Sequence, residues 1–385
     1  MSNISLAIID PDGDTLVILP YVEESSPSSD KKIIASESGL QLATPGNEEP
    51  NGVNGPEAEH CESTLPPPLS EVHFRVSTKH LSLASRRAKI MFKGPYEESV
   101  PLPTDGLRRW IFEPIFNPTA FEIVMNIIHL QTHKIPDNLT LVMMANVAAI
   151  VDDLECHSAV DFFAKIWLHK LGTRIPDAAQ PRELSQWVLI SSVFNQSELF
   201  QTATHRAILH SKLPIPSFGL PIRPKIIEVM EGKRETGIRQ VIEQLHKLMI
   251  KLSQDGQFCA VECQSMLLGA LVQQMHTARL LSPIPPRPFN GISLWELLCT
   301  VRSFRSPKIY CPRGHAALGE EGNVWYLEQR NAGSAIKRQR KIMPPSSPTL
   351  PKSLVAHKCS LQAQIEPELK RLESQIKGLD SADFS

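Results

Sequence analysis

The sequence predicts an α+β fold in the first part of the chain and an all-α region behind it. The first observation is a change of period at Ser77. Residues 72–76 alternate apolar and polar side chains, as a strand does, and apolar residues then recur at helical spacing as far as Met91. The second observation is helical periodicity that continues beyond Pro176. The third is a long stretch with few apolar residues, 21–70, which divides the front part in two.

The front domain begins with a short apolar strand, predicted over Asp14–Leu19. The acidic turn before it, Asp10–Asp14, has some residues of a calcium loop, but the EF-hand spacing and the closing Glu are missing, so we expect no calcium site. Residues 21–70 are rich in Ser, Glu, Pro, Gly and Asn, and they cannot bury enough apolar surface to become ordered. We therefore expect a disordered insertion that splits one domain into residues 1–20 and 71–172.

The rest of the front domain is predicted to be mostly helical. Trp110–Ile115 is an apolar patch that we interpret as a strand. Asn117 followed by Pro118 predicts a helix start, with Asn as the N-cap and Pro in the first position. Further helices are predicted over Leu139–Val151 and over His157–Leu171, where apolar residues recur at i, i+3, i+4 and i+7 before a glycine ends the pattern.

The second domain, residues 176–310, is predicted to contain only helices. Their expected spans are 183–195, 198–211, 225–252, 261–281 and a last helix opened by a capping box at Ser293 and Glu296. The tail, residues 357–385, is predicted to be an amphipathic helix with an apolar seam whose spacings are four and three, too short for a stable coiled coil of its own. We expect this seam to dock on the helical domain; its members are Ile365, Leu369, Leu372, Ile376 and Leu379.

Residues 311–356 lack sustained periodicity and are predicted to be a disordered linker. Two interpretations stay open: an insertion peculiar to this sequence, or translated non-coding sequence. The linker contains a short basic run, which is a candidate nuclear-import signal, although solvated charge runs of this size are common. The residues of the run are Lys337, Arg338, Arg340 and Lys341.

Bulk composition excludes several classes of function. The 40 Lys and Arg residues balance 41 Asp and Glu, a net charge of −1, so we expect neither direct nucleic-acid binding nor attachment to a membrane surface. No run approaches the roughly 18 apolar residues of a membrane span, and the first residues do not resemble a secretory signal. The seven cysteines are scattered, so we expect reduced thiols in an intracellular protein of the nucleus, the cytoplasm or both.

The residues capable of chemistry form no catalytic pattern that we recognise. We find no Ser-His-Asp, Cys-His or His-Glu-x-x-His arrangement and no Gly-rich phosphate loop after a strand, so we predict a protein that is not an enzyme and has no cofactor. Cys259 and Cys263 invite a zinc interpretation, but their spacing is not that of a common zinc finger, and we favour buried free thiols. The pairs that would complete such a zinc site are Cys311 with His315, or His357 with Cys359.

The strand and helix around Ser77 resemble the strand and first helical hairpin of a BTB/POZ domain, whose pattern reads roughly Phe-x-Val-His-Lys-x-x-Leu-x-x-x-Ser. The positions that match are Phe74, Val76, Leu81 and Ser85. The usual His falls on Ser77, and Ala88 replaces the usual aromatic residue. The run from Ile150 to Val160 resembles BTB/POZ proteins of filamentous fungi, whose role is largely unassigned. The resemblance covers Asp14–Leu19 and Val72–Leu171, and it continues into parts of the helical domain.

The resemblance implies a small sheet capped by helical hairpins and a function in protein–protein contact, often as a homodimer. Our first hypothesis is therefore a scaffold or interaction module. The alternatives are a substrate adaptor that binds a cullin scaffold for ubiquitin transfer, a transcription-associated regulator, and, less favoured, a metal-binding or enzymatic helical domain. The hairpin has more apolar positions than one buried face requires, so Leu81, Leu83 and Ile90 are the candidate interaction surface.

Overall fold

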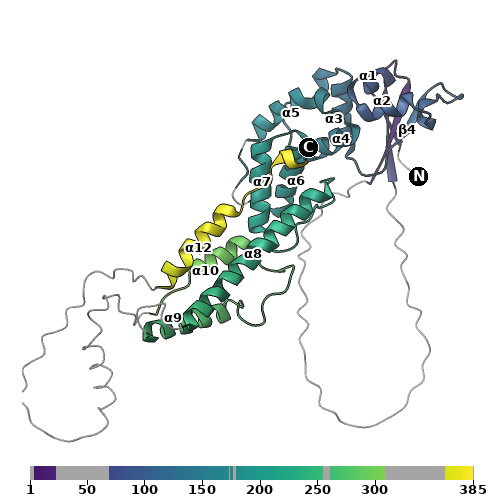
Figure 1. Cartoon of the computed structure of the whole chain (residues 1–385). Helices are drawn as coiled ribbons and strands as arrows, with labels where there is room; N and C mark the ends of the chain where they lie inside the picture. The colour runs from purple at the N-terminus through teal and green to yellow at the C-terminus, as the bar shows by residue number, and fades with distance from the viewer. Residues whose placement is uncertain are drawn as a thin grey trace, which may run out of the picture. The chain divides into compact units, whose positions relative to one another are not determined.

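The computed structural model describes residues 4–22, 69–172, 174–176, 179–254, 261–307 and 360–384. The chain has a small four-stranded mixed sheet near its N-terminus, followed by a mostly helical region (Figure 1). It divides into two compact units. The first unit comprises residues 1–137 and 150–162, and the second comprises residues 138–149 and 163–385. The division passes through two helices, earlier in the chain than the boundary near residue 172 that the sequence suggests.

The sheet of the first unit has the strand order β1-β3-β2-β4. Its strands are β1 (Ile4–Ile8), β2 (Thr15–Val22), β3 (Leu69–Val76) and β4 (Arg108–Ile111). The central pair, β2 with β3, is antiparallel, and each edge strand runs parallel to its neighbour. One face of the sheet is buried because alternate residues of β2, β3 and β4 point into the core. The buried residues of that face are Val17, Leu19, Phe74, Val76 and Trp110.

The helices of the first unit begin where the sequence predicts, except that the helix predicted over Leu139–Val151 starts two residues later and ends three residues later. They are α1 (Thr78–Ala84), α2 (Arg86–Lys93), α3 (Pro118–Ile128), α4 (Leu141–Leu154) and α5 (His157–Leu171), of which the last two continue into the second unit. Asn117 caps α3 by accepting a hydrogen bond from the Ala120 N–H at 3.0 Å, with Pro118 in the first turn. The Phe121 ring lies 5.3 Å from the ring of Phe74, so α3 covers the buried face of the sheet.

Two boundaries of the front domain differ from the sequence-based expectation. The predicted insertion, 21–70, includes residues that belong to strands, because Tyr21 pairs with Ser70 and Val22 pairs with Leu69. Residues 23–68 lie outside the described part of the chain. The predicted strand from Trp110 is shorter and shifted, since β4 starts two residues earlier, where it pairs with β2.

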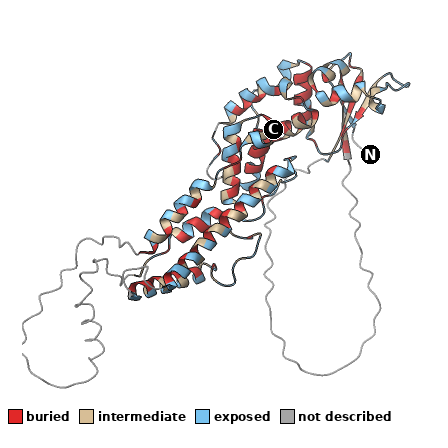
Figure 2. Cartoon of the chain, in the orientation of Figure 1, coloured by how far each residue is buried: buried red, intermediate tan, exposed pale blue. Residues whose placement is uncertain are grey.

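The second unit is built around one long helix, α8 (Pro224–Ser253). The other helices that lie wholly in this unit are α6 (Pro181–Val193), α7 (Ser197–His210), α9 (Val261–Thr277), α10 (Leu294–Arg302) and α12 (Leu361–Gln375). Figure 2 shows buried and exposed stripes that alternate along these helices, as the sequence periodicity predicts. Only half of the predicted capping box forms: Ser293 accepts from the Glu296 N–H, while the Glu296 carboxylate contacts Lys212 at 2.8 Å.

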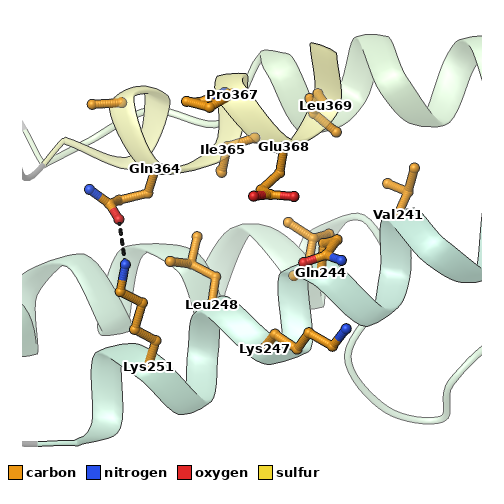
Figure 3. A pocket seen from close by; sticks show the side chains of 12 residues that line it. Val241, Gln244, Lys247, Leu248, Lys251, Gln364, Ile365, Pro367, Glu368 and Leu369 are labelled. Atoms are coloured by element: carbon orange, nitrogen blue, oxygen red, sulfur yellow. Dashed lines mark hydrogen bonds between the residues drawn. The ribbon is translucent and has the colours of Figure 1, made fainter. Parts of the chain in front are cut away.

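The C-terminal tail docks on the second unit, which confirms the sequence-based expectation. Helix α12 lies along α8 and α10, and most of the apolar seam is buried. The helix is shorter than predicted, because it ends at Gln375 and the last two seam residues, Ile376 and Leu379, lie beyond it. Figure 3 shows the groove of about 340 Å³ that remains between α8 and α12, where Lys251 donates a hydrogen bond to Gln364 at 3.2 Å. Pro367 lies inside α12 and cannot donate the usual backbone hydrogen bond, so packing rather than intrinsic propensity holds this helix.

Beyond α12, residues 376–384 run across α7 as a strap that ends in a short 3-10 helix, η4 (Ser381–Phe384). The Leu379 N–H donates to the buried hydroxyl of Thr204 at 2.9 Å, and the Phe384 ring lies 6.1 Å from the ring of Phe200. Gly378 approaches the backbone so closely that a Cβ there would lie 1.9 Å from the carbonyl oxygen of Gln201. Residues 376–384 are thus an integral part of the helical unit.

Candidate interaction surface

Ser85 and two arginines tie the α1–α2 hairpin to the rest of the first unit. The Ser85 hydroxyl accepts from the Ala88 N–H at 2.9 Å and donates to the Leu154 carbonyl oxygen at 2.5 Å, so one side chain caps α2 and ties it to the end of α4. Arg86 pairs with Glu155 at 2.6 Å. Ala88 is fully buried, so its small side chain belongs to the core.

Arg87 anchors the same hairpin through both its charge and its flat guanidinium group. It forms an ion pair with Asp153, and its guanidinium carbon lies 5.7 Å from the centre of the Trp110 ring and 5.5 Å from that of Phe112. Burial raises the pKa of Asp153, and the Arg87 charge opposes that rise. These contacts fix the face that the hairpin turns towards solvent.

The three residues predicted as the interaction surface do not share one environment. Leu81 is fully buried and packs inside the unit, so its assignment to an exposed surface was wrong. Leu83 is 88% exposed and Ile90 is 49% exposed, so both are available for contact. The reason is helical spacing: Leu81 points to the side of α1 that faces the core, and Leu83 lies two residues, about 200°, further around the helix.

A second apolar surface lies on the outer face of the sheet, and the sequence analysis missed it. Strand pairing places Leu6, His73, Ile18 and Ile111 in one row across the four strands. Leu6 is 61% exposed, and its neighbours of the same face on β1, Ile4 and Ile8, are also exposed. The alternation of apolar with small residues over residues 4–8 is a strand signal that would have revealed β1.

Two histidines and an aspartate gather beside the end of β1, and they form the strongest cluster of potential metal ligands in the described residues. One ligand atom each of Asp10, His80 and His129 lies within 4.8 Å of the others. Both His129 nitrogens are already used, however, because Nδ1 bonds to the Met125 carbonyl oxygen at 2.8 Å and Nε2 accepts from the Ser77 N–H at 2.9 Å. Burial lowers the pKa of His129, so the ring is neutral at pH 7 and its role is structural.

The other residues that the sequence suggests as zinc ligands or as a nuclear-import signal lie mostly outside the described part of the chain. This holds for Cys259, for both completing pairs and for the basic run Lys337–Lys341. Cys263 is described and buried in α9. Burial raises the pKa of the Cys156 thiol to about 12, so that group is not a nucleophile at neutral pH.

Comparisons with protein-family models, with curated proteins and with solved structures found no match for this chain. Among the described residues, no helix is both long enough and apolar enough to cross a membrane.

Proposed function

We propose that this chain is a non-catalytic protein–protein interaction module or scaffold that self-associates through its first unit, as the resemblance to BTB/POZ domains implies. The observation that carries the proposal is the apolar surface of that unit. Leu83 and Ile90 are exposed on the hairpin, and the apolar residues of β1 are exposed on the sheet. Burying one such side chain in a contact contributes about 1.5–3 kcal/mol, and homodimer interfaces are more apolar than ordinary surface.

Two buried groups that could carry chemistry have structural environments. His129 has both ring nitrogens bonded to backbone groups, so it has no nitrogen left to act on a substrate. The Cys156 thiol stays protonated. The order of mixed sheet, helical hairpin and following helices is also what the resemblance implies for such a module.

Self-association is tested by sedimentation velocity on the full chain at tens of micromolar, where we expect a dimer. The variant Leu83→Asp with Ile90→Lys measures how much the hairpin contributes to the dimer. Leu81 is left unchanged, because a charge at that buried position would unfold the unit. Leu213→Asp is the matched control, because Leu213 is similarly apolar and 61% exposed but belongs to the second unit.

A wild-type chain that remains a folded monomer would refute the self-association. If the hairpin variant still dimerises, the hairpin is not part of the contact, although the self-association itself still holds. If the Leu213 variant loses the dimer, the contact lies in the helical unit, and the proposal is contradicted.

A further inference from the structure

The two edges of the sheet are protected to very different degrees. β4 is four residues long, carries Arg108 and Arg109, and is followed by Glu113 and Pro114, which are features that discourage another strand from pairing. β1 is the opposite edge and has no charge, no proline and no partner on its outer side among the described residues. An unprotected edge strand presents a row of free backbone donors and acceptors, which is a template for a further strand.

The side chains of β1 add apolar surface to this open edge. Ile4, Leu6 and Ile8 share one face and are 59%, 61% and 50% exposed. Exposed apolar residues on an unprotected edge are uncommon in a strand that remains solvated. The edge and the apolar face together indicate a surface that is covered in the working protein.

The sequence of β1 identifies a second copy as the occupant. Ile4-Ser5-Leu6-Ala7-Ile8 is nearly symmetric about its centre. Antiparallel pairing of two copies about Leu6 places Leu6 opposite Leu6, Ile4 opposite Ile8, and small Ser5 opposite small Ala7. The paired residues then match in size, which a one-residue slip would destroy because it would put large apolar residues opposite small ones.

The charges beside β1 fit the same arrangement. β3 places Glu71 next to Ile4 and Arg75 next to Ile8. A two-fold axis through Leu6 therefore puts Glu71 of one copy in the same row as Arg75 of the other, about 14 Å apart across three strand spacings. Opposite charges share each row, so the paired sheets meet no like-charge repulsion there.

We propose that β1 pairs edge to edge with β1 of a second copy, antiparallel about Leu6, so that two four-stranded sheets become one continuous sheet. This inference rests on the proposed self-association and assigns its contact to a strand edge.

The test compares two lysine substitutions on the same row of the sheet, measured on the full chain by sedimentation velocity. Leu6→Lys puts two ammonium groups opposite each other across the two-fold axis, and we expect the dimer dissociation constant to rise at least about tenfold. Ile111→Lys is the matched control, because Ile111 is 66% exposed on the same row but at the protected edge, and its dimer should be unchanged. Circular dichroism melts show whether each variant is folded, and Leu6→Thr provides a milder variant that keeps strand propensity.

Mixing two variants tests the symmetry directly. Leu6→Lys and Leu6→Glu chains are each expected to be monomeric, and an equimolar mixture is expected to regain the dimer, because the two charges face each other only if position 6 lies on the axis. A dimer that Leu6→Lys and Leu6→Thr leave unchanged would overturn the strand contact while self-association stands. A mixture that stays monomeric would overturn the register about Leu6. A monomeric wild type would overturn both this contact and the proposed function.

Discussion

Two short apolar segments, β1 near one end of the chain and α12 near the other, differ in whether their apolar residues are buried. The seam of α12 is buried against α8 and α10, with Leu361, Leu369 and Leu372 almost inaccessible. Ile4, Leu6 and Ile8 of β1 are at least half exposed. Neither segment is stable alone, since α12 contains a proline and β1 has five residues. The difference shows that the chain provides an apolar partner for its tail but, within the described residues, none for the outer face of β1.

The largest expected effect on stability is the difference between two leucine truncations, one in each segment. Leu369→Ala removes a side chain that is 2% exposed and leaves a cavity, so we expect the free energy of unfolding to fall by about 3 kcal/mol. Leu6→Ala should change it by no more than about 0.5 kcal/mol, because the side chain is largely solvated. Urea denaturation at a concentration low enough to keep the chain monomeric measures both. Equal losses would mean that the tail is no better buried than β1.

The strap after α12 provides the next test. Gly378→Ala would place a Cβ against the Gln201 carbonyl, so the strap must move, and we expect a loss of about 2 kcal/mol. Gly232→Ala is the matched control, because a Cβ there meets nothing within 4 Å and the residue lies inside α8. Replacing that helical glycine should raise stability by about 0.5–1 kcal/mol. If both variants were stabilised, the tail would not lie closely on α7.

Acid should destabilise the second unit, and His205 is one expected cause. Burial lowers the pKa of His205, although a hydrogen bond with the backbone of Ile376 in the strap raises it, and His210 and Arg206 lower it further. The unfolded chain takes up a proton near pH 6.5 while folded His205 stays neutral, so stability is lost as the pH falls below about 6.5. We expect His205→Gln to have a smaller drop in urea midpoint between pH 7.5 and pH 5.5 than the wild type. An identical drop in both proteins would exclude His205 as a source.

The smallest effect is expected at the charged contact of α12. Arg302 forms an ion pair with Glu373 and lies 3.5 Å from Glu366, and these contacts raise its pKa. The groups are partly exposed, so Arg302→Gln should cost at most about 1 kcal/mol. The cost should shrink in 1 M salt, because the Debye length falls to about 3 Å there. A salt-independent loss would show that the arginine acts through packing.

The helices could be predicted well from the sequence because their signals are local. His157–Leu171 was predicted with the bounds that α5 has, and Asn117 was identified as the cap that it is. The docking of α12 was also predictable, because an isolated two-heptad seam needs a partner. A fourth strand was missed since β1 is short and lies in a stretch that we compared only with secretory signals.

The surface was less predictable than the fold. Spacing alone did not separate buried Leu81 from exposed Leu83, because that distinction depends on which side of α1 meets the core. The cluster of Asp10, His80 and His129 joins residues far apart in sequence, so no local motif marks it. Strand register, which aligns Leu6 with Ile111 across the sheet, is likewise a property of long-range pairing.

The strand order of the first unit has a consequence for how the chain emerges during synthesis. β1 and β2 leave the ribosome early, but the strand that joins them, β3, begins only at Leu69, and β4 only at Arg108. Contacts between such distant residues form slowly because the loop must close first. For that interval two apolar strands are without their partner, a state in which nascent chains aggregate. We therefore expect the yield of folded protein to depend on chaperones and to rise when Val22 and Leu69 are joined by a short turn.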